Sequence, residues 1–332
     1  MPKNQRILPV GQLYVPDIDE FTSILSQISK TKYFTNYGPL CQELESNISS
    51  YLNVKYVVCV NNCTIGLIIA LKALYQDSCV ITPRFSFPAT MNSISMIGAD
   101  IVFCDTLESS PNVSLNSLEE QLILNPFCKV ILIPNLWSTV NDIKSIESLA
   151  HKYNVNVLYD SSQSFGCSYQ GEKLGSNGSA EVFSFHATKL ITAFEGGCIT
   201  TNDKNLYEKL TRIRSDYGTR GHKDSCTITV NGRMSELQAG LCLKSLKSIN
   251  AYIEHNLSLF SLYQKLLLPS PYYKLFIPSS KQIESSYQYL ILIFLPEKTF
   301  LRDKLKSILC SHGILARSYF DYNFSLFNKS SV

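Results

Sequence analysis

The sequence has few charged residues for its length and almost no excess of either sign. Charged residues make up 17% of the 332 residues, and 30 Lys and Arg stand against 27 Asp and Glu, a formal net charge of +3. No basic run and no alternation of basic with aromatic residues occurs, so a nucleic-acid partner is not expected. Hydrophobic residues make up 45%, which excludes an intrinsically disordered chain.

Long hydrophobic runs are also missing. The longest apolar segments, at 129–134 and 289–295, are too short to cross a bilayer as helices. The first ten residues lack the apolar core of a signal peptide, and we find no internal repeat or low-complexity segment. We therefore expect a cytoplasmic globular protein with no membrane partner.

The 11 cysteines lack the spacing of a metal site. No Cys-x-x-Cys pair occurs and no group of Cys and His has zinc-ligand spacing, so no metal is expected. Most cysteines, such as Cys59 and Cys104, lie in apolar runs. We expect buried, reduced thiols, as in a cytosolic protein.

Apolar runs that read as strands alternate with helix-like segments from about residue 40. These runs lack strict polar alternation, which is typical of strands covered on both faces. They lie at 55–61, 79–83, 101–105, 129–134, 155–160, 181–185 and 197–201. The alternation predicts an α/β fold with a large, mostly parallel, doubly wound sheet.

The pattern changes after about residue 245. A helix, the apolar run 287–295 and a helix over 300–313 indicate a smaller α+β unit. We predict a large domain over 1–245 and a small C-terminal domain over 246–332.

Polar residues follow several predicted strands, where ligands bind in open α/β sheets. Cys63 and Thr64 begin a helix after the first strand, and such a helix start either binds phosphate or is simply capped by Asn62. Phe87 follows the second strand and Asp160 ends the fifth. Each of these residues alone has an ordinary structural explanation.

Lys189 completes an unusual order of residues. It lies in "SFHATK", at the end of an apolar strand, where burial lowers the pKa of a lysine and favours the neutral amine that attacks an aldehyde. A phosphate-type helix start, an aromatic residue, a strand-end acid and a lysine follow one another along the chain. This set suggests pyridoxal 5′-phosphate, which needs a lysine for its aldehyde and an acid for its ring nitrogen.

The motifs "TNYGPLCQELE", "YDSSQSFG", "SFHATKLITAFEGGCITTND" and "NGRMSELQAGL" resemble the DegT/StrS family of pyridoxal-phosphate-dependent nucleotide-sugar aminotransferases. The resemblance implies an aspartate-aminotransferase-like fold of type I. It is strongest to viosamine-type enzymes, which transfer an amino group from glutamate to a nucleotide-linked 4-keto-6-deoxy sugar. Their product is a 4-amino-4,6-dideoxy sugar.

The resemblance also implies a role for individual positions. The catalytic residues would be Lys189, which bonds to the cofactor's aldehyde, and Asp160, which pairs with its ring nitrogen. Further cofactor contacts would come from Cys63, Thr64, Phe87, Gln163 and Ser184. Asn231 would reach the phosphate in the neighbouring subunit, which implies a homodimer with shared active sites. Substrate contacts would come from Thr35, Asn36, Gly38, Glu195 and Arg317.

Two features depart from the family pattern. Cys63 stands where the phosphate turn usually has glycine. The family also usually continues some tens of residues beyond 316–320, so the small domain is expected to be shortened. Two alternatives stay open: a non-catalytic or decayed homologue, and an aminotransferase for another keto sugar or a keto-cyclitol. The family's dehydratase branch replaces the lysine by histidine, and Lys189 argues against it.

Overall fold

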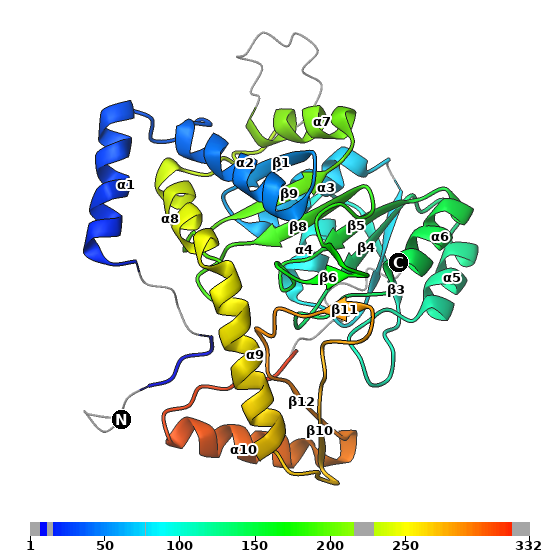
Figure 1. Ribbon diagram of the computed structural model, residues 1–332. Helices are drawn as coiled ribbons and strands as arrows, with labels where there is room; N and C mark the ends of the chain where they lie inside the picture. Colours follow the sequence, from blue (N-terminus) through cyan, green and yellow to red (C-terminus); the bar gives the residue numbers. More distant parts are fainter. Residues whose placement is uncertain (1–6, 12–15, 77, 216–228, 321–332) are drawn as a thin grey trace.

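The computed structural model describes residues 7–11, 16–76, 78–215 and 229–320. A seven-stranded sheet lies at its centre, with the order β1-β9-β8-β5-β4-β2-β3 (Figure 1). The strands are β1 (Tyr56–Val60), β2 (Cys79–Pro83), β3 (Asp100–Cys104), β4 (Val130–Pro134), β5 (Asn156–Asp160), β8 (Ala180–Ser184) and β9 (Gly197–Thr201). β9 is antiparallel to both of its neighbours, and the remaining pairs are parallel. The predicted mostly parallel α/β sheet is confirmed.

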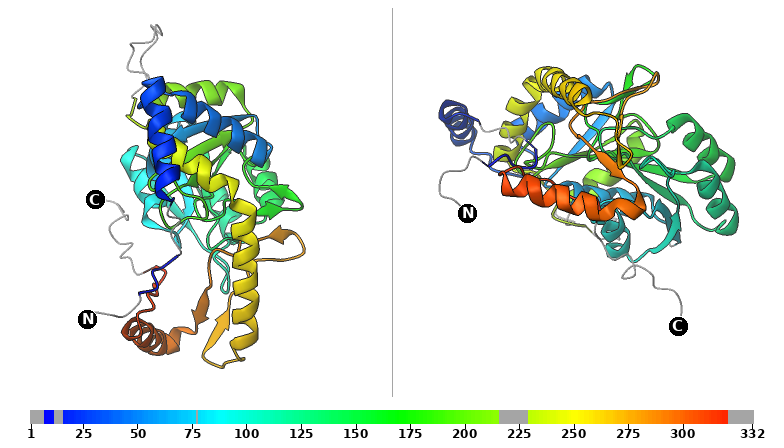
Figure 2. Two further views of the ribbon diagram at one scale, coloured as in Figure 1. Left: turned by 60° about the vertical axis from the view of Figure 1, so that its left-hand side comes forward. Right: turned by 90° about the horizontal axis from the view of Figure 1, so that it is seen from below.

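Helices cover both faces of this sheet, as Figures 1 and 2 show. Along β4, Val130 and Leu132 join the hydrophobic cluster beneath α3 (Cys63–Leu74), α4 (Pro88–Met96) and α7 (Lys204–Ser215). Ile131 and Ile133 join the opposite cluster. The helices of that second face are α1 (Ile18–Thr31), α2 (Pro39–Leu52), α5 (Leu115–Leu124), α6 (Ile143–Tyr153) and α8 (Glu236–Lys247). Burial on both faces explains why the strands carry no polar alternation.

A smaller group of elements follows α8. α9 (Ile249–Leu266) leads away from the sheet toward α10 (Thr299–Ser311) and the strand pair β10 (Tyr273–Leu275) and β12 (Leu292–Phe294) (Figure 1). A short 3-10 helix (Pro296–Lys298) precedes α10, and β11 (Ile283–Glu284) pairs with β6 (Ser168–Tyr169), which pairs with β7 (Glu172–Lys173). The domain boundary at 245 falls within α8 and stays a prediction; residues 321–332 lie outside the described part.

The strand expected over 287–295 is much shorter than predicted. Only Leu292–Phe294 forms a strand, and Tyr287 has a left-handed φ of 51°. The residues before it bond to side chains and loops instead of to a strand: Ser285 Oγ donates to the Ser138 carbonyl at 2.7 Å. This irregular segment passes over the candidate active site.

The expectation of reduced thiols is wrong for one pair. Cys79 opens β2, Cys128 precedes the neighbouring β4, and the two form a disulfide with Cα atoms 4.8 Å apart. That separation is within the usual range for a disulfide. The other described cysteines are free. In the described residues, no helix is long and apolar enough to cross a membrane.

Candidate active site

A cavity of about 1460 Å³ opens beyond the carboxyl ends of the parallel strands. Nine of the thirteen predicted site residues line it: Cys63, Thr64, Phe87, Asp160, Gln163, Ser184, Lys189, Glu195 and Arg317. They follow β1, β2, β5 and β8, with Arg317 arriving from the C-terminal part of the chain. The parallel sheet thus brings together residues that are far apart in the sequence.

Asp160 is held by donors on two sides. Its Oδ2 accepts from Thr90 Oγ1 at 2.8 Å, and its Oδ1 accepts from the Ser162 N–H at 3.2 Å. Thr90 lies in the first turn of α4, and Ser86 Oγ lies 2.7 Å from the Thr90 hydroxyl. With both oxygens accepting and the side chain 4% exposed, the carboxylate has a fixed direction beside the cavity.

Lys189 approaches the same cavity from the turn after β8. Burial lowers the pKa of its amine, while the negative charge of Asp160 opposes that shift. A lower pKa leaves more of the amine neutral and therefore nucleophilic near neutral pH. The sequence-based expectation of a depressed lysine pKa agrees in direction with the structure.

The start of α3 provides an anion-binding position. Asn62 caps the helix by accepting from the Ile65 N–H at 2.9 Å, and no described residue accepts from the N–H groups of Cys63 and Thr64. Free N–H groups and the positive end of the helix dipole favour a phosphate. Burial, with a smaller effect of the Asp160 charge, raises the pKa of the Cys63 thiol, so this position offers its N–H without a competing thiolate.

Gly197 lets β9 approach this helix start. A Cβ on Gly197 would lie 2.5 Å from the Phe183 carbonyl oxygen and 3.1 Å from the Cys63 nitrogen. No other residue fits there without moving the backbone. Ser184, at the end of β8, accepts from the His186 N–H at 3.3 Å.

Gln163, Phe87 and Glu195 complete the lining. Gln163 Oε1 accepts from the backbone N–H of Trp137 at 2.8 Å, which fixes the amide beside the cavity, and Trp137 itself is 6% exposed and packed. Phe87 is 46% exposed at the cavity, and its ring packs edge-on against Phe320 with the centroids 6.1 Å apart. The Glu195 carboxylate lies 3.7 Å from His186 Nε2.

These residues fit pyridoxal 5′-phosphate. An amine with a depressed pKa, an oriented carboxylate, an exposed aromatic ring and a helix start with free N–H groups face one cavity. The cofactor needs each of these groups. Together with the mostly parallel sheet, they define the class of pyridoxal-phosphate enzymes of fold type I.

Comparison with known proteins gives the family. Residues 17–329 match the model of the DegT/DnrJ/EryC1/StrS aminotransferase family. The chain belongs to this family, as the sequence motifs predicted.

Individual relatives share most of the chain. A dTDP-4-amino-4,6-dideoxy-D-glucose transaminase of Shigella dysenteriae is 32% identical over 94% of this chain and 84% of its own length. A UDP-4-amino-4,6-dideoxy-N-acetyl-beta-L-altrosamine transaminase of Campylobacter jejuni is 29% identical over 94% of this chain and 83% of its own length. The crystal structure of DesI, solved in the presence of its TDP-sugar product, superposes with a TM-score of 0.88 at 27% identity, covering 96% of this chain and 80% of DesI.

Four predicted site residues do not line the cavity: Thr35, Asn36, Gly38 and Asn231. Asn36 Oδ1 accepts from Arg233 Nη1 at 2.7 Å, and Asn231 Oδ1 accepts from Arg233 Nε at 3.2 Å. Both asparagines are exposed, whereas Gly38 is buried against Glu236. This group, Asn36, Asn231 and Arg233, forms a separate polar surface of the same chain.

Sequence reasoning missed two residues of the site. Thr90 carried a weak signal, because it stands in the first turn of the helix that follows Phe87. Tyr289 carried no signal in the sequence, because it comes from the irregular segment that the sequence suggested was a strand. Its hydroxyl lies 3.4 Å from Lys189 Nζ.

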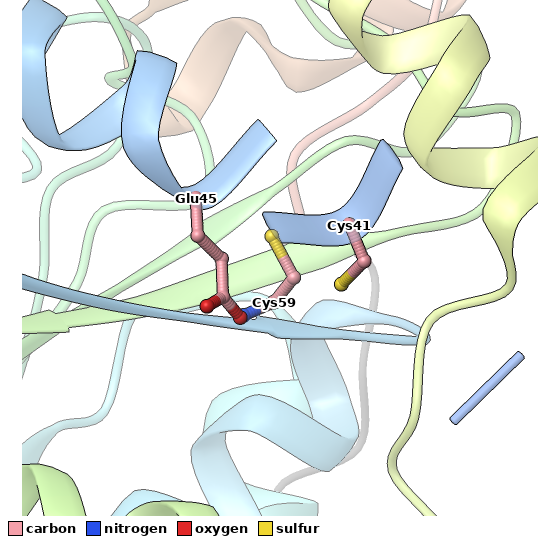
Figure 3. A group of neighbouring side chains, drawn as sticks. All are labelled: Cys41, Glu45 and Cys59. Atoms are coloured by element: carbon pink, nitrogen blue, oxygen red, sulfur yellow. The ribbon is translucent and has the colours of Figure 1, made fainter. Parts of the chain in front are cut away.

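Another group of potential ligands lies away from the cavity. Cys41 and Glu45 of α2 and Cys59 of β1 have side-chain ligand atoms within 4.8 Å of one another (Figure 3). Glu45 Oε1 already accepts from Arg214 Nη1 at 3.0 Å and from the Cys59 N–H at 2.8 Å. Burial raises the pKa of the Cys59 thiol well above its usual range. A cation would have to displace the arginine, so we interpret the group as a buried structural network.

Proposed function

We propose that this chain transfers an amino group from glutamate to a nucleotide-linked 4-keto-6-deoxy sugar, giving a 4-amino-4,6-dideoxy sugar. The observation that carries the proposal is that Lys189 and Asp160 line one cavity beside the start of α3. The names of the Shigella relative and of DesI's sugar product support the substrate class.

The cofactor, when bound, supplies an electron sink that stabilises negative charge on the reacting carbon. Asp160 keeps a positive charge on the opposite ring nitrogen, because Thr90 and Ser162 fix the direction of its carboxylate. The Lys189 amine moves a proton to and from the carbon that gains or loses the amino group. Phe87 covers the flat ring, and the N–H groups of Cys63 and Thr64 hold the phosphate.

Substrate contacts arise from two places in this proposal. Glu195 and Arg317 line the cavity and meet the substrate from the same chain. Thr35, Asn36 and Asn231 reach the cavity of a second copy, and the buried Gly38 shapes the turn that carries Thr35 and Asn36, so the active enzyme is a homodimer with shared sites. We place this enzyme in the cytoplasm, and assign residues 246–332 to a small domain beside the larger one.

One relative favours a second class of sugar substrate. The Campylobacter relative carries a UDP-linked, N-acetylated sugar in its name. The choice between these sugars depends on contacts in the outer part of the cavity.

The test is a panel of dTDP- and UDP-linked keto sugars incubated with enzyme, pyridoxal 5′-phosphate and glutamate. We expect the mass of one 4-keto-6-deoxy sugar to change by replacement of its ketone with an amine. Lys189→Ala should abolish both this product and the visible absorption band of lysine-bound cofactor. Lys129→Ala removes a half-buried lysine outside the cavity, whose amine donates to the Pro126 carbonyl at 3.2 Å; it is the matched control and should keep both.

A folded wild-type protein that binds the cofactor but aminates no sugar in the panel would contradict the proposal. That result would favour a non-catalytic homologue. Amination of a 3-keto sugar or a keto-cyclitol alone would keep the enzyme class and overturn the substrate.

A further inference from the structure

A tyrosine hydroxyl touches the amine of Lys189, and the function proposed above leaves it unused. Lys189 Nζ donates to the hydroxyl oxygen of Tyr289 at 3.4 Å. Within the described residues, this is the one hydrogen bond that Nζ makes. The Asp160 carboxylate influences the amine through its charge, without a hydrogen bond to it.

The segment that carries Tyr289 is fastened to the loop that carries Lys189. Gln288 Nε2 donates to the carbonyl of Thr188, the residue before the lysine, at 2.6 Å. Further back, Ser286 Oγ donates to Ser138 Oγ at 3.0 Å. Because adjacent residues of the segment contact adjacent residues of the loop, the hydroxyl and the amine keep their relative position.

We propose that Tyr289 is a positioning residue for Lys189, whose hydroxyl holds the amine inside the cavity whenever the amine is not bonded to the cofactor. A lysine side chain has four rotatable bonds. An amine without a hydrogen-bond partner therefore samples many conformers in which it cannot react with the cofactor. A phenol can donate to the neutral amine and accept from the protonated one. Burial raises the pKa of Tyr289, so the phenol keeps its proton in either case.

The inference rests on the proposed role of Lys189, and its test needs no sugar. Apoenzyme carrying Tyr289→Phe is mixed with pyridoxal 5′-phosphate, and covalent attachment is followed by the growth of the visible band. We expect attachment about fivefold slower than in the wild type, the effect of losing one hydrogen bond. Affinity for pyridoxamine 5′-phosphate, which has no aldehyde to bond to the lysine, should be unchanged.

Tyr287→Phe is the matched control. Its hydroxyl bonds to Ser279 Oγ at 2.7 Å, away from the lysine, so its removal should leave the attachment rate at the wild-type value. Equal rates for Tyr289→Phe and the wild type would overturn the inference, and so would an equal slowing by Tyr287→Phe. Weaker binding of pyridoxamine 5′-phosphate to Tyr289→Phe would show that the ring shapes the cavity instead. A wild-type protein that never forms the visible band would contradict the role of Lys189 itself.

Discussion

At the scale of single residues, the site depends on how polar groups are held. Among the residues that the structure describes, Asp160 has two donors, whereas the Lys189 amine has one hydroxyl partner and lies in surroundings that depress its pKa. A carboxylate that must stay charged needs donors, and an amine that must become neutral needs to lose water. The two residues of this one cavity are therefore prepared for their roles in opposite ways.

Thr90 provides a test of how much the orientation of Asp160 matters. Thr90→Val keeps the shape of the side chain and removes the donor to Oδ2, so we expect turnover to fall about tenfold, since hydrogen bonds to charged groups contribute about 1.5–3 kcal/mol. Steady-state kinetics with the accepted keto sugar measure the change.

Thr82 offers a control for that substitution. Its hydroxyl is fully buried and has no hydrogen-bond partner among the described residues. Thr82→Val should therefore leave turnover unchanged and leave the melting temperature equal or higher, because an unpaired buried hydroxyl is removed. Equal turnover in Thr90→Val and Thr82→Val would show that the hydrogen bond from Thr90 to Asp160 does not affect turnover.

At the scale of elements, the site is assembled where the sheet, α3 and α4 meet. The N-cap of α3 by Asn62 sets the direction of its first N–H groups, and the absence of a side chain at Gly197 lets β9 pass beside them. The phosphate position proposed at α3 therefore depends on close backbone contact more than on any charged side chain.

Gly197→Ala tests this contact. The new methyl group would overlap the Phe183 carbonyl, and the start of α3 or β9 must shift, at a cost of about 1–3 kcal/mol. We expect a lower melting temperature and cofactor affinity reduced at least tenfold, measured by titration of the apoenzyme.

Gly98→Ala separates stability from cofactor binding. Gly98 has a φ of +80° and no neighbour within 4 Å of an added Cβ, so alanine strains only the backbone, by about 1–2 kcal/mol. Its melting temperature should fall while its cofactor affinity stays at the wild-type value. If Gly197→Ala also lowered the melting temperature and left the cofactor affinity at the wild-type value, the close approach of β9 to α3 would not affect phosphate binding.

At the scale of the whole molecule, the predicted site residues divide into two surfaces. Nine line the cavity, whereas the exposed Asn36 and Asn231 are joined by Arg233 outside it. A homodimer that brings this outer surface to the partner's cavity would unite the two sets.

Mixing two inactive variants tests that arrangement. In a dimer of Lys189→Ala with Asn231→Ala, one cavity contains an intact lysine and receives an intact Asn231 from the other chain. If subunits exchange freely, half of the dimers are mixed and each has one complete site, so about a quarter of wild-type activity should return. Activity is measured after the mixture is unfolded and refolded together. No recovery, with dimers confirmed by light scattering, would place Asn231 at its own chain's site or at none.

Much of the fold could be predicted because local patterns and tertiary packing agree. The runs at 79–83 and 197–201 match β2 and β9 residue for residue, since strands buried on both faces carry no charged residues and no alternation of polar with apolar residues. The strand expected over 287–295 was wrong over most of its length, because there the local pattern and the tertiary packing disagree. Its apolar residues reflect packing over the cavity, and its hydrogen bonds go to loops such as Thr188.

The sequence by itself determined the chemistry. Lys189, Asp160 and the helix start after 55–61 are recognisable by residue type and by their places at strand ends, because a parallel sheet collects its carboxyl ends at one edge. Only the tertiary structure decided which side chains hold these groups. Thr90 meets Asp160 across 70 residues and Tyr289 meets Lys189 across 100, and no local pattern encodes contacts between segments that folding alone brings together.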